Sequence, residues 1–190
     1  MELQSRQDKL TTHRAFHPAT HREDTSMPLV QKGDTLSASV EIRASAADVY
    51  AVVSDVTRIP EWSPETYRAE WLTPNRFRAW NRRRLGWWKT DANVVTAEPD
   101  REFSFIVQVE ALGGDWAQWT YLIEPGPAAG TVRLTETFRM CVALPIGAII
   151  FEYLCLFMRD RPSDLQANLQ TSVDKIRDIV ETAVTTHDAR

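Results

Sequence analysis

Hydrophobic and polar residues alternate along the segment TVRLTETFRM, from Thr131 to Met140, as they do in a β-strand with one buried face. The apolar side chains of one face are Val132, Leu134, Phe138 and Met140. Glu136 lies on this same face. Because burial penalises a charged carboxylate, a glutamate at this position needs either a partner or a function. We therefore take Glu136 as the first candidate for a functional residue.

The same kind of pattern predicts six further strands before this one. They cover 35–44, Tyr67–Thr73, Arg76–Arg83, Trp87–Thr96, Glu102–Val109 and Trp116–Ile123. Short segments with Gly, Pro, Asn or Asp separate the later strands, and they read TPN, RLG, EPDR, LGGD and EPGPAAG. The middle of the chain is thus predicted to be a run of consecutive antiparallel strands.

Helical spacing predicts a helix near each end of the folded region. The segment SAADVYAVVSDV begins at Ser45, the expected N-cap, and Asp48 completes a capping box. A short turn over Val56–Ile59 is expected to end at Pro60. Towards the C-terminus, Ser163 and Gln166 form another expected capping box. After it, apolar residues recur every three or four positions, which predicts a long amphipathic helix; they are Leu165, Leu169, Val173, Ile176, Val180 and Val184.

These elements predict an α+β fold in which a seven-stranded antiparallel sheet needs a cover for its apolar face. Only the last helix is long enough to provide that cover. A strongly curved sheet wrapped around one helix leaves a gap unless side chains fill it. We expect a ligand to bind in that gap.

One folded domain is predicted over residues 34–185, with a tail at 1–33 before it and a short tail at 186–190 after it. Residues 1–33 lack sustained apolar periodicity, so we expect them to be disordered. His13, His17 and His21 recur every four residues, which on a helix would give a metal-binding face. Pro18 interrupts such a helix, and we expect neither a metal site nor a cofactor.

Charge and hydropathy narrow the class of partner. The net charge of −4 argues against nucleic acid, which is bound largely by clustered Lys and Arg. The apolar run Pro145–Met158 contains Glu152 and is shorter than the roughly 20 residues that a membrane span requires. We expect this run to pack on the domain. Contact with a membrane surface, or with a second subunit in a homodimer, stays open.

The remaining signals concern the compartment. Cys141 and Cys155 are too few for a disulfide framework, and we expect both to be small buried side chains in a reducing cytoplasm. No basic segment followed by an apolar one opens the chain, so we expect no secretion signal and a cytoplasmic protein.

The order of several segments resembles a known family. They are VEIRASAADVYAVVSDVTRIPEWSP, NRFRAWNRR, WWKTDANVVTAEPDREFSF, WTYLIEP and GTVRLTETFRM. Together they are similar to the polyketide cyclase/dehydrase family of the START-like helix-grip (SRPBCC) superfamily, over about residues 34–185. The resemblance implies a helix-grip fold, with a curved sheet around the C-terminal helix and an internal hydrophobic cavity. Such cavities serve aromatic ring closure, dehydration, lipid carriage or plain ligand binding.

Alternation along each strand nominates the residues that face this cavity. The catalytic candidates are Glu136, as an acid whose pKa burial would raise, and Tyr121, as a donor to a developing enolate oxygen. The ligand-binding candidates are Asn81, Trp88, Thr90, Phe103, Phe105, Trp119, Leu134, Phe138 and Trp62. Asn81 could hold a carbonyl group, and the aromatic rings could stack on a flat molecule. Equally, Glu136 could be paired within a fixed polar network that sets the strand register.

Two segments outside the strand faces are also candidates. Trp62 stands between Pro60 and Pro64 and could plug the mouth of the pocket, with Glu61 and Glu65 beside it in solvent. The basic segment Arg82–Lys89 could attract an anionic head group or the arm of a carrier protein, or it could be an ordinary exposed hairpin.

The sequence therefore predicts a protein that binds a small hydrophobic molecule, polyketide-like or lipid-like. Cyclisation or dehydration with acid/base help from Glu136 is the catalytic form of this hypothesis. The alternative is a non-catalytic carrier or sensor in which Glu136 only anchors the ligand. A third interpretation is a structural protein whose interior is filled by side chains.

Overall fold

A computed structural model of the chain describes residues 29–108, 114–143, 145–155 and 160–188. Their strands are β1 (Thr35–Ile42), β2 (Thr66–Thr73), β3 (Arg76–Arg83), β4 (Gly86–Glu98), β5 (Glu102–Gln108), β6 (Asp115–Pro125) and β7 (Val132–Met140). Their helices are α1 (Ala46–Val53), the 3₁₀ helix η1 (Val56–Arg58), α2 (Ile59–Trp62), α3 (Ile146–Cys155) and α4 (Arg161–Asp188). The histidines that raised a metal site lie outside the described residues.

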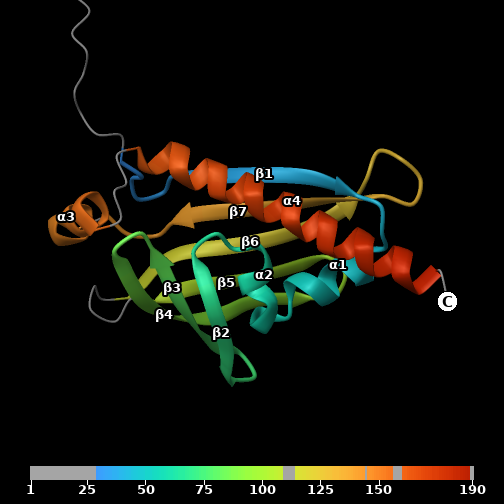
Figure 1. Cartoon of the computed structure of the whole chain (residues 1–190), viewed down its shortest axis with the longest axis horizontal. Helices are drawn as coiled ribbons and strands as arrows, with labels where there is room; N and C mark the ends of the chain where they lie inside the picture. Colours follow the sequence, from blue (N-terminus) through green and yellow to red (C-terminus); the bar gives the residue numbers. More distant parts are fainter. Residues whose placement is uncertain (1–28, 109–113, 144, 156–159, 189–190) are drawn as a thin grey trace, which may run out of the picture.

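The seven strands form one antiparallel sheet in the order β1-β7-β6-β5-β4-β3-β2. Apart from β1, each strand is adjacent to its neighbour in the sequence, as the short connecting segments predicted. The curved sheet wraps around helix α4, which runs across its concave face, while α1 and α2 lie beside the helix on the same face (Figure 1). The predicted helix-grip fold is therefore confirmed.

Local signals explain where the helices begin, with two corrections. Ser45 caps α1 and forms the predicted capping box with Asp48. Pro60 does not end its helical segment but stands in the first turn of α2, where a missing N–H group costs nothing. Helix α4 is capped by Asp160 rather than by Ser163, since Asp160 Oδ1 accepts a hydrogen bond from the Ser163 backbone N–H over 3.1 Å.

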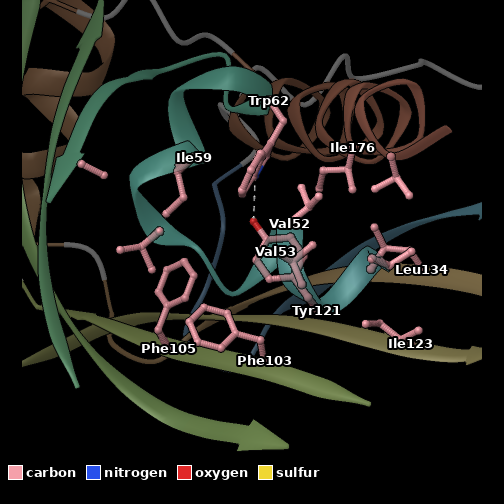
Figure 2. Close-up of a cluster of buried hydrophobic side chains, with 14 of the residues drawn as sticks. Val52, Val53, Ile59, Trp62, Phe103, Phe105, Tyr121, Ile123, Leu134 and Ile176 are labelled. Atoms are coloured by element: carbon pink, nitrogen blue, oxygen red, sulfur yellow. Dashed lines mark hydrogen bonds between the residues drawn. The ribbon is translucent and has the colours of Figure 1, made fainter. Parts of the chain in front are cut away.

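The core fills one end of the space between the sheet and the helices. Val49 and Val53 of α1 and Ile176 of α4 are buried against inward residues of the strands. Figure 2 shows Phe103, Phe105, Ile123 and Leu134 in this cluster, with Trp62 pointing towards Tyr121. Large side chains from both layers leave no room for a ligand at this end.

Small and polar side chains face one another at the opposite end. Strand β3 presents Ala79 and Asn81, β4 presents Thr90, and α4 presents Asn168 and Ser172. None of these side chains is large enough to span the distance between a curved sheet and a straight helix. The interior is consequently open where these residues meet.

Three regions differ from the sequence predictions. Residues 29–33 fell within the predicted tail, whereas Val30 is buried against Phe138 and neighbouring core residues. The two cysteines are half-buried rather than fully buried. Helix α3 was expected to pack on the domain, yet its apolar side chains Ile146, Ile150 and Leu154 are exposed.

Candidate functional site

A cavity of about 430 Å³ lies between the sheet and α4. Aromatic rings form much of its wall, from Trp62, Phe77, Trp88, Phe105, Trp119 and Phe138. Gly147 and Ala148 of α3 line it at the end where β3 turns into β4 (Figure 1). Because Pro64 and Gly147 are exposed while Trp62 and Glu136 are buried, the cavity leads from an open mouth to a closed interior.

Strand alternation places Glu136 in the wall of this interior, as predicted. The side chain is 2% exposed and points inward between Leu134 and Phe138 of β7. Tyr121, its cross-strand neighbour on β6, donates a hydrogen bond from its hydroxyl group to Glu136 Oε1 over 3.0 Å. The other oxygen, Oε2, has no hydrogen-bond partner among the residues that the structure describes.

A third residue completes a chain of hydrogen bonds. Trp62 Nε1 donates to the hydroxyl oxygen of Tyr121 over 3.2 Å (Figure 2). The Trp62 side chain is 1% exposed, so this residue is part of the interior and does not plug the mouth as expected. The tyrosine hydroxyl thus accepts from Trp62 and donates to Glu136, and its proton is not available to a ligand.

Burial controls the ionisation of this group. Desolvation raises the pKa of Glu136 from an ordinary value of 4.5 to about 8, and the hydroxyl groups of Tyr121 and Ser172 act in the opposite direction. The Ser172 hydroxyl lies near the carboxyl group, but its position does not give Oε2 a hydrogen bond. Burial and the nearby Glu136 also raise the pKa of Tyr121, which keeps its hydroxyl protonated.

The hydrogen bonds fix where the proton of Glu136 lies. A pKa of about 8 keeps the carboxyl group mostly neutral at pH 7. Oε1 already accepts the proton of Tyr121, so the acidic proton resides on Oε2. The interior therefore presents one hydrogen-bond donor to the cavity, a neutral carboxylic acid with no partner in the protein.

A smaller polar group lies nearer the mouth. Thr66 donates from its hydroxyl group to Asn81 Oδ1 over 2.7 Å, and Asn81 Nδ2 lies 3.4 Å from Thr90 Oγ1. Both Asn81 and Thr90 line the cavity, as predicted. One N–H of the Asn81 amide has no partner in these contacts and could bind a ligand oxygen.

A cluster of ion pairs joins the sheet to α4 beside the mouth. Arg83 of β3 lies 3.1 Å from Glu65 and 2.8 Å from Asp164 of α4. Asn168 Nδ2 donates to the same glutamate, Glu65 Oε1, over 3.1 Å. Glu65 is therefore a paired residue and not the solvated one that was expected.

Most of the predicted site residues meet in this cavity. Its lining includes Glu136, Tyr121, Asn81, Trp88, Thr90, Phe105, Trp119, Phe138 and Trp62. Phe103 and Leu134 face inward but belong to the packed core, where α1 and α4 cover them. Sequence reasoning missed Ser172 and Asn168, although each falls on the apolar stripe of α4, three residues after Leu169 and Leu165 respectively.

Two other classes of site are not found in the described part of the chain. Its His, Cys, Asp and Glu side chains form no group of three that could bind a metal ion. None of its helices combines the length and apolar character needed to cross a membrane.

The sequence matches the profile of a protein family over residues 34–181. That family is described as polyketide cyclase / dehydrase and lipid transport. The match covers nearly all of the described residues and includes the cavity. A search of curated sequences gives no significant match.

Solved structures share the fold. A START superfamily protein from Mycobacterium smegmatis is 19% identical, with a TM-score of 0.59 over 80% of this chain and 99% of that chain. A polyketide-cyclase-like protein from Corynebacterium glutamicum is 26% identical, with a TM-score of 0.50 over 82% of this chain and 96% of that chain. The di-domain ARO/CYC StfQ from the steffimycin biosynthetic pathway is 15% identical, with a TM-score of 0.60 over 80% of this chain and 51% of that chain.

Proposed function

Because this chain belongs to the polyketide cyclase/dehydrase and lipid transport family, we propose that it binds a small hydrophobic molecule between the sheet and α4. The observation that carries the proposal is the aromatic-lined cavity of about 430 Å³ with an unpartnered carboxyl oxygen in its wall. Side chains around an unfilled space lose contacts that a ligand would restore. A buried polar atom without a partner also costs free energy, and a ligand acceptor would recover it.

These contacts define the class of ligand. Rings of Trp88, Trp119 and Phe105 favour a molecule with a flat apolar body. The Oε2–H group of Glu136 calls for a hydrogen-bond acceptor at the inner end, and a carbonyl oxygen is the simplest one. A polyketide-like or lipid-like molecule with a carbonyl group meets both requirements.

Catalysis by Glu136 is the finer form of the proposal. A hydrogen bond from a neutral acid to a ligand carbonyl oxygen withdraws electron density and acidifies the neighbouring C–H group. Enolisation of this kind precedes both aldol-type ring closure and loss of water from a β-hydroxy ketone. In this scheme Tyr121 orients the carboxyl group and does not touch the ligand.

A non-catalytic carrier is the second candidate, and a specific observation favours it. Proton removal from carbon requires a base in addition to the acid. Of the titratable side chains in the described lining, Tyr121 is committed to Glu136, and Glu65 is held by Arg83 and Asn168. A carrier needs only the acceptor contact to Glu136.

Binding can be tested with N-phenyl-1-naphthylamine, an uncharged dye that fluoresces in apolar surroundings. Ala79→Leu adds a side chain to the cavity wall, and we expect it to weaken dye binding at least about tenfold by occupying the ligand's space. Ala97→Leu makes the same change at an exposed alanine of β4 and should leave binding unchanged. Equal affinities in both variants and the wild type would contradict binding in this cavity.

The catalytic form needs a separate experiment. Glu136→Gln keeps the size of the side chain and a hydrogen-bond donor but removes the transferable proton. With a β-hydroxy ketone substrate of the polyketide class, lost turnover and retained binding would support acid catalysis. A carrier instead predicts a co-purified lipophile in native mass spectrometry and equal behaviour of the two proteins in turnover assays.

A further inference from the structure

A second hollow lies directly beside the mouth of the cavity. Its lining is Pro64, Glu65, Arg82, Arg83, Arg84, Trp87 and Asn168. Three of these residues, Pro64, Glu65 and Asn168, also line the cavity itself. A molecule that protrudes from the cavity at this point therefore lies over the hollow.

The hollow is basic. Arg82, Arg83 and Arg84 are consecutive at the end of β3, and the carboxylates against them are Glu65 and Asp164, both of which pair with Arg83. Three positive and two negative charges leave a local excess of positive charge, in a chain whose net charge is −4. This excess is localised at the opening of an apolar cavity.

The side chains beside Arg83 are arranged to receive a ligand group. The guanidinium carbon of Arg82 stands 5.7 Å from the centre of the Tyr67 ring, which orients the side chain without occupying its N–H donors. No carboxylate of the described residues pairs with Arg82. Trp87, its cross-strand neighbour on β4, is 66% exposed and adds an apolar surface next to these donors.

We infer that this hollow is a head-group site, which binds the anionic end of an amphipathic ligand whose apolar body occupies the cavity. The inference deepens the proposed function and rests on it. Carboxylate, phosphate and sulfonate groups share the chemistry, because each accepts several hydrogen bonds from guanidinium groups. The ligand class is thus an apolar molecule with a negative charge at one end.

The two ends of the cavity make this orientation the favourable one. An anion at the inner end would lie beside the buried carboxyl group of Glu136, far from any described cation. The same anion at the mouth lies beside arginines and within reach of water. The ligand therefore enters with its apolar end first and keeps its charge at the surface.

A matched pair of dyes separates this inference from the proposed function. 1-Anilinonaphthalene-8-sulfonate and N-phenyl-1-naphthylamine have the same ring system and differ by the sulfonate group. The test variant is Arg82→Gln combined with Arg84→Asn, because residue 84 has a φ of 50° and asparagine tolerates that conformation. The control is Arg101→Gln, which removes a 71% exposed arginine from the turn between β4 and β5.

We expect the double variant to weaken sulfonate dye binding about five- to tenfold and to leave binding of the neutral dye within about twofold. Added NaCl should weaken sulfonate binding to the wild type and not to the double variant. Equal losses for both dyes, or no loss for the sulfonate dye, would overturn the head-group site while leaving the cavity proposal intact. If the neutral dye does not bind the wild type, both proposals are wrong.

Competition identifies the form of anion. Dodecanoate and dodecyl phosphate should each displace the sulfonate dye from the wild type, and their relative strengths show whether a carboxylate or a phosphate head fits better. Inorganic phosphate should not displace it at comparable concentration, since it lacks the apolar body. Displacement by inorganic phosphate alone would mean that the hollow binds free anions, and it would overturn the assignment of an amphipathic ligand.

Discussion

Tyr121 and Glu136 are direct cross-strand neighbours on β6 and β7, joined by a hydrogen bond of 3.0 Å from the tyrosine hydroxyl to Oε1. The bond uses one oxygen of the carboxyl group and leaves the other facing the cavity. A register shift of one residue would turn both side chains out of the interior. The pairing of these two strands is therefore what creates the polar feature of the site.

The first prediction concerns pH. Glu136 has a pKa of about 8 in the folded protein against an ordinary value of 4.5, so between these values the folded state holds a proton that the unfolded state releases. The free energy of unfolding is therefore highest below the lower value and should fall by about 1.4 kcal/mol per pH unit as the pH rises through this window. Urea denaturation from pH 5 to pH 9 measures it.

Glu136→Gln removes this titration, so the variant should gain stability relative to the wild type as the pH rises and level off above pH 8. Glu124→Gln, at an exposed position of β6, is the matched control and should follow the wild type. Identical pH profiles for the wild type and Glu136→Gln would exclude a buried neutral carboxyl group.

The second prediction tests the hydrogen-bond chain. Tyr121→Phe removes the acceptor of Trp62 Nε1–H and the donor to Glu136 at once. Two buried groups then lack partners, and we expect the free energy of unfolding to fall by about 2–4 kcal/mol. The pH at which Glu136 titrates should also rise, because the tyrosine hydrogen bond lowers its pKa. Tyr67→Phe, at a residue that is 47% exposed, should change neither quantity.

The third prediction concerns the ion pairs beside the mouth. Arg83→Gln leaves two carboxylates unpaired, and because the arginine side chain is only 18% exposed we expect a loss of about 1–3 kcal/mol in unfolding free energy. The neutral dye should dissociate faster, since this cluster holds β3 to α4. Arg76→Gln breaks a pair at a 46% exposed arginine and should cost under about 1 kcal/mol. Equal losses in the two variants would show that Arg83 has no special role.

The fourth prediction separates core from cavity. Leu134 is fully buried in the packed cluster, so Leu134→Ala should lower the free energy of unfolding by about 2–5 kcal/mol. Dye affinity measured under native conditions should stay within about twofold. Trp88→Leu, in the cavity wall, should show the reverse pattern, with weaker dye binding and a small change in stability. Weaker binding in Leu134→Ala would mean that the cavity extends to this residue.

Sequence patterns predicted the strands well because alternation depends only on which face is buried. That rule placed Glu136 and Tyr121 in the interior before any contact was known. It could not separate Phe103 and Leu134, which are core, from Phe105 and Phe138, which line the cavity. All four face inward, and only the packing of α1 and α4 decides which of them are covered.

Contacts between distant segments escaped the sequence for a different reason. The pairing of Glu65 with Arg83 and Asn168 depends on how the segment before β2, the end of β3 and α4 meet in space. Nothing in the local composition of EWSPE distinguishes a paired glutamate from a solvated one. The hydrogen bond of Trp62 to Tyr121, across 59 positions of sequence, is equally a product of the tertiary fold.

The strand order has a consequence for how the protein is made. β1 is the first strand of the domain, yet its only neighbour in the sheet is β7, the last strand. Ala38 pairs with Glu136, so β1 must wait for almost a hundred residues of chain to be synthesised before it finds its place. Contacts of such long sequence separation slow folding. On the ribosome, the β2–β6 hairpins can form early, but the wall that carries Glu136 is joined to both its neighbours only near the end of translation.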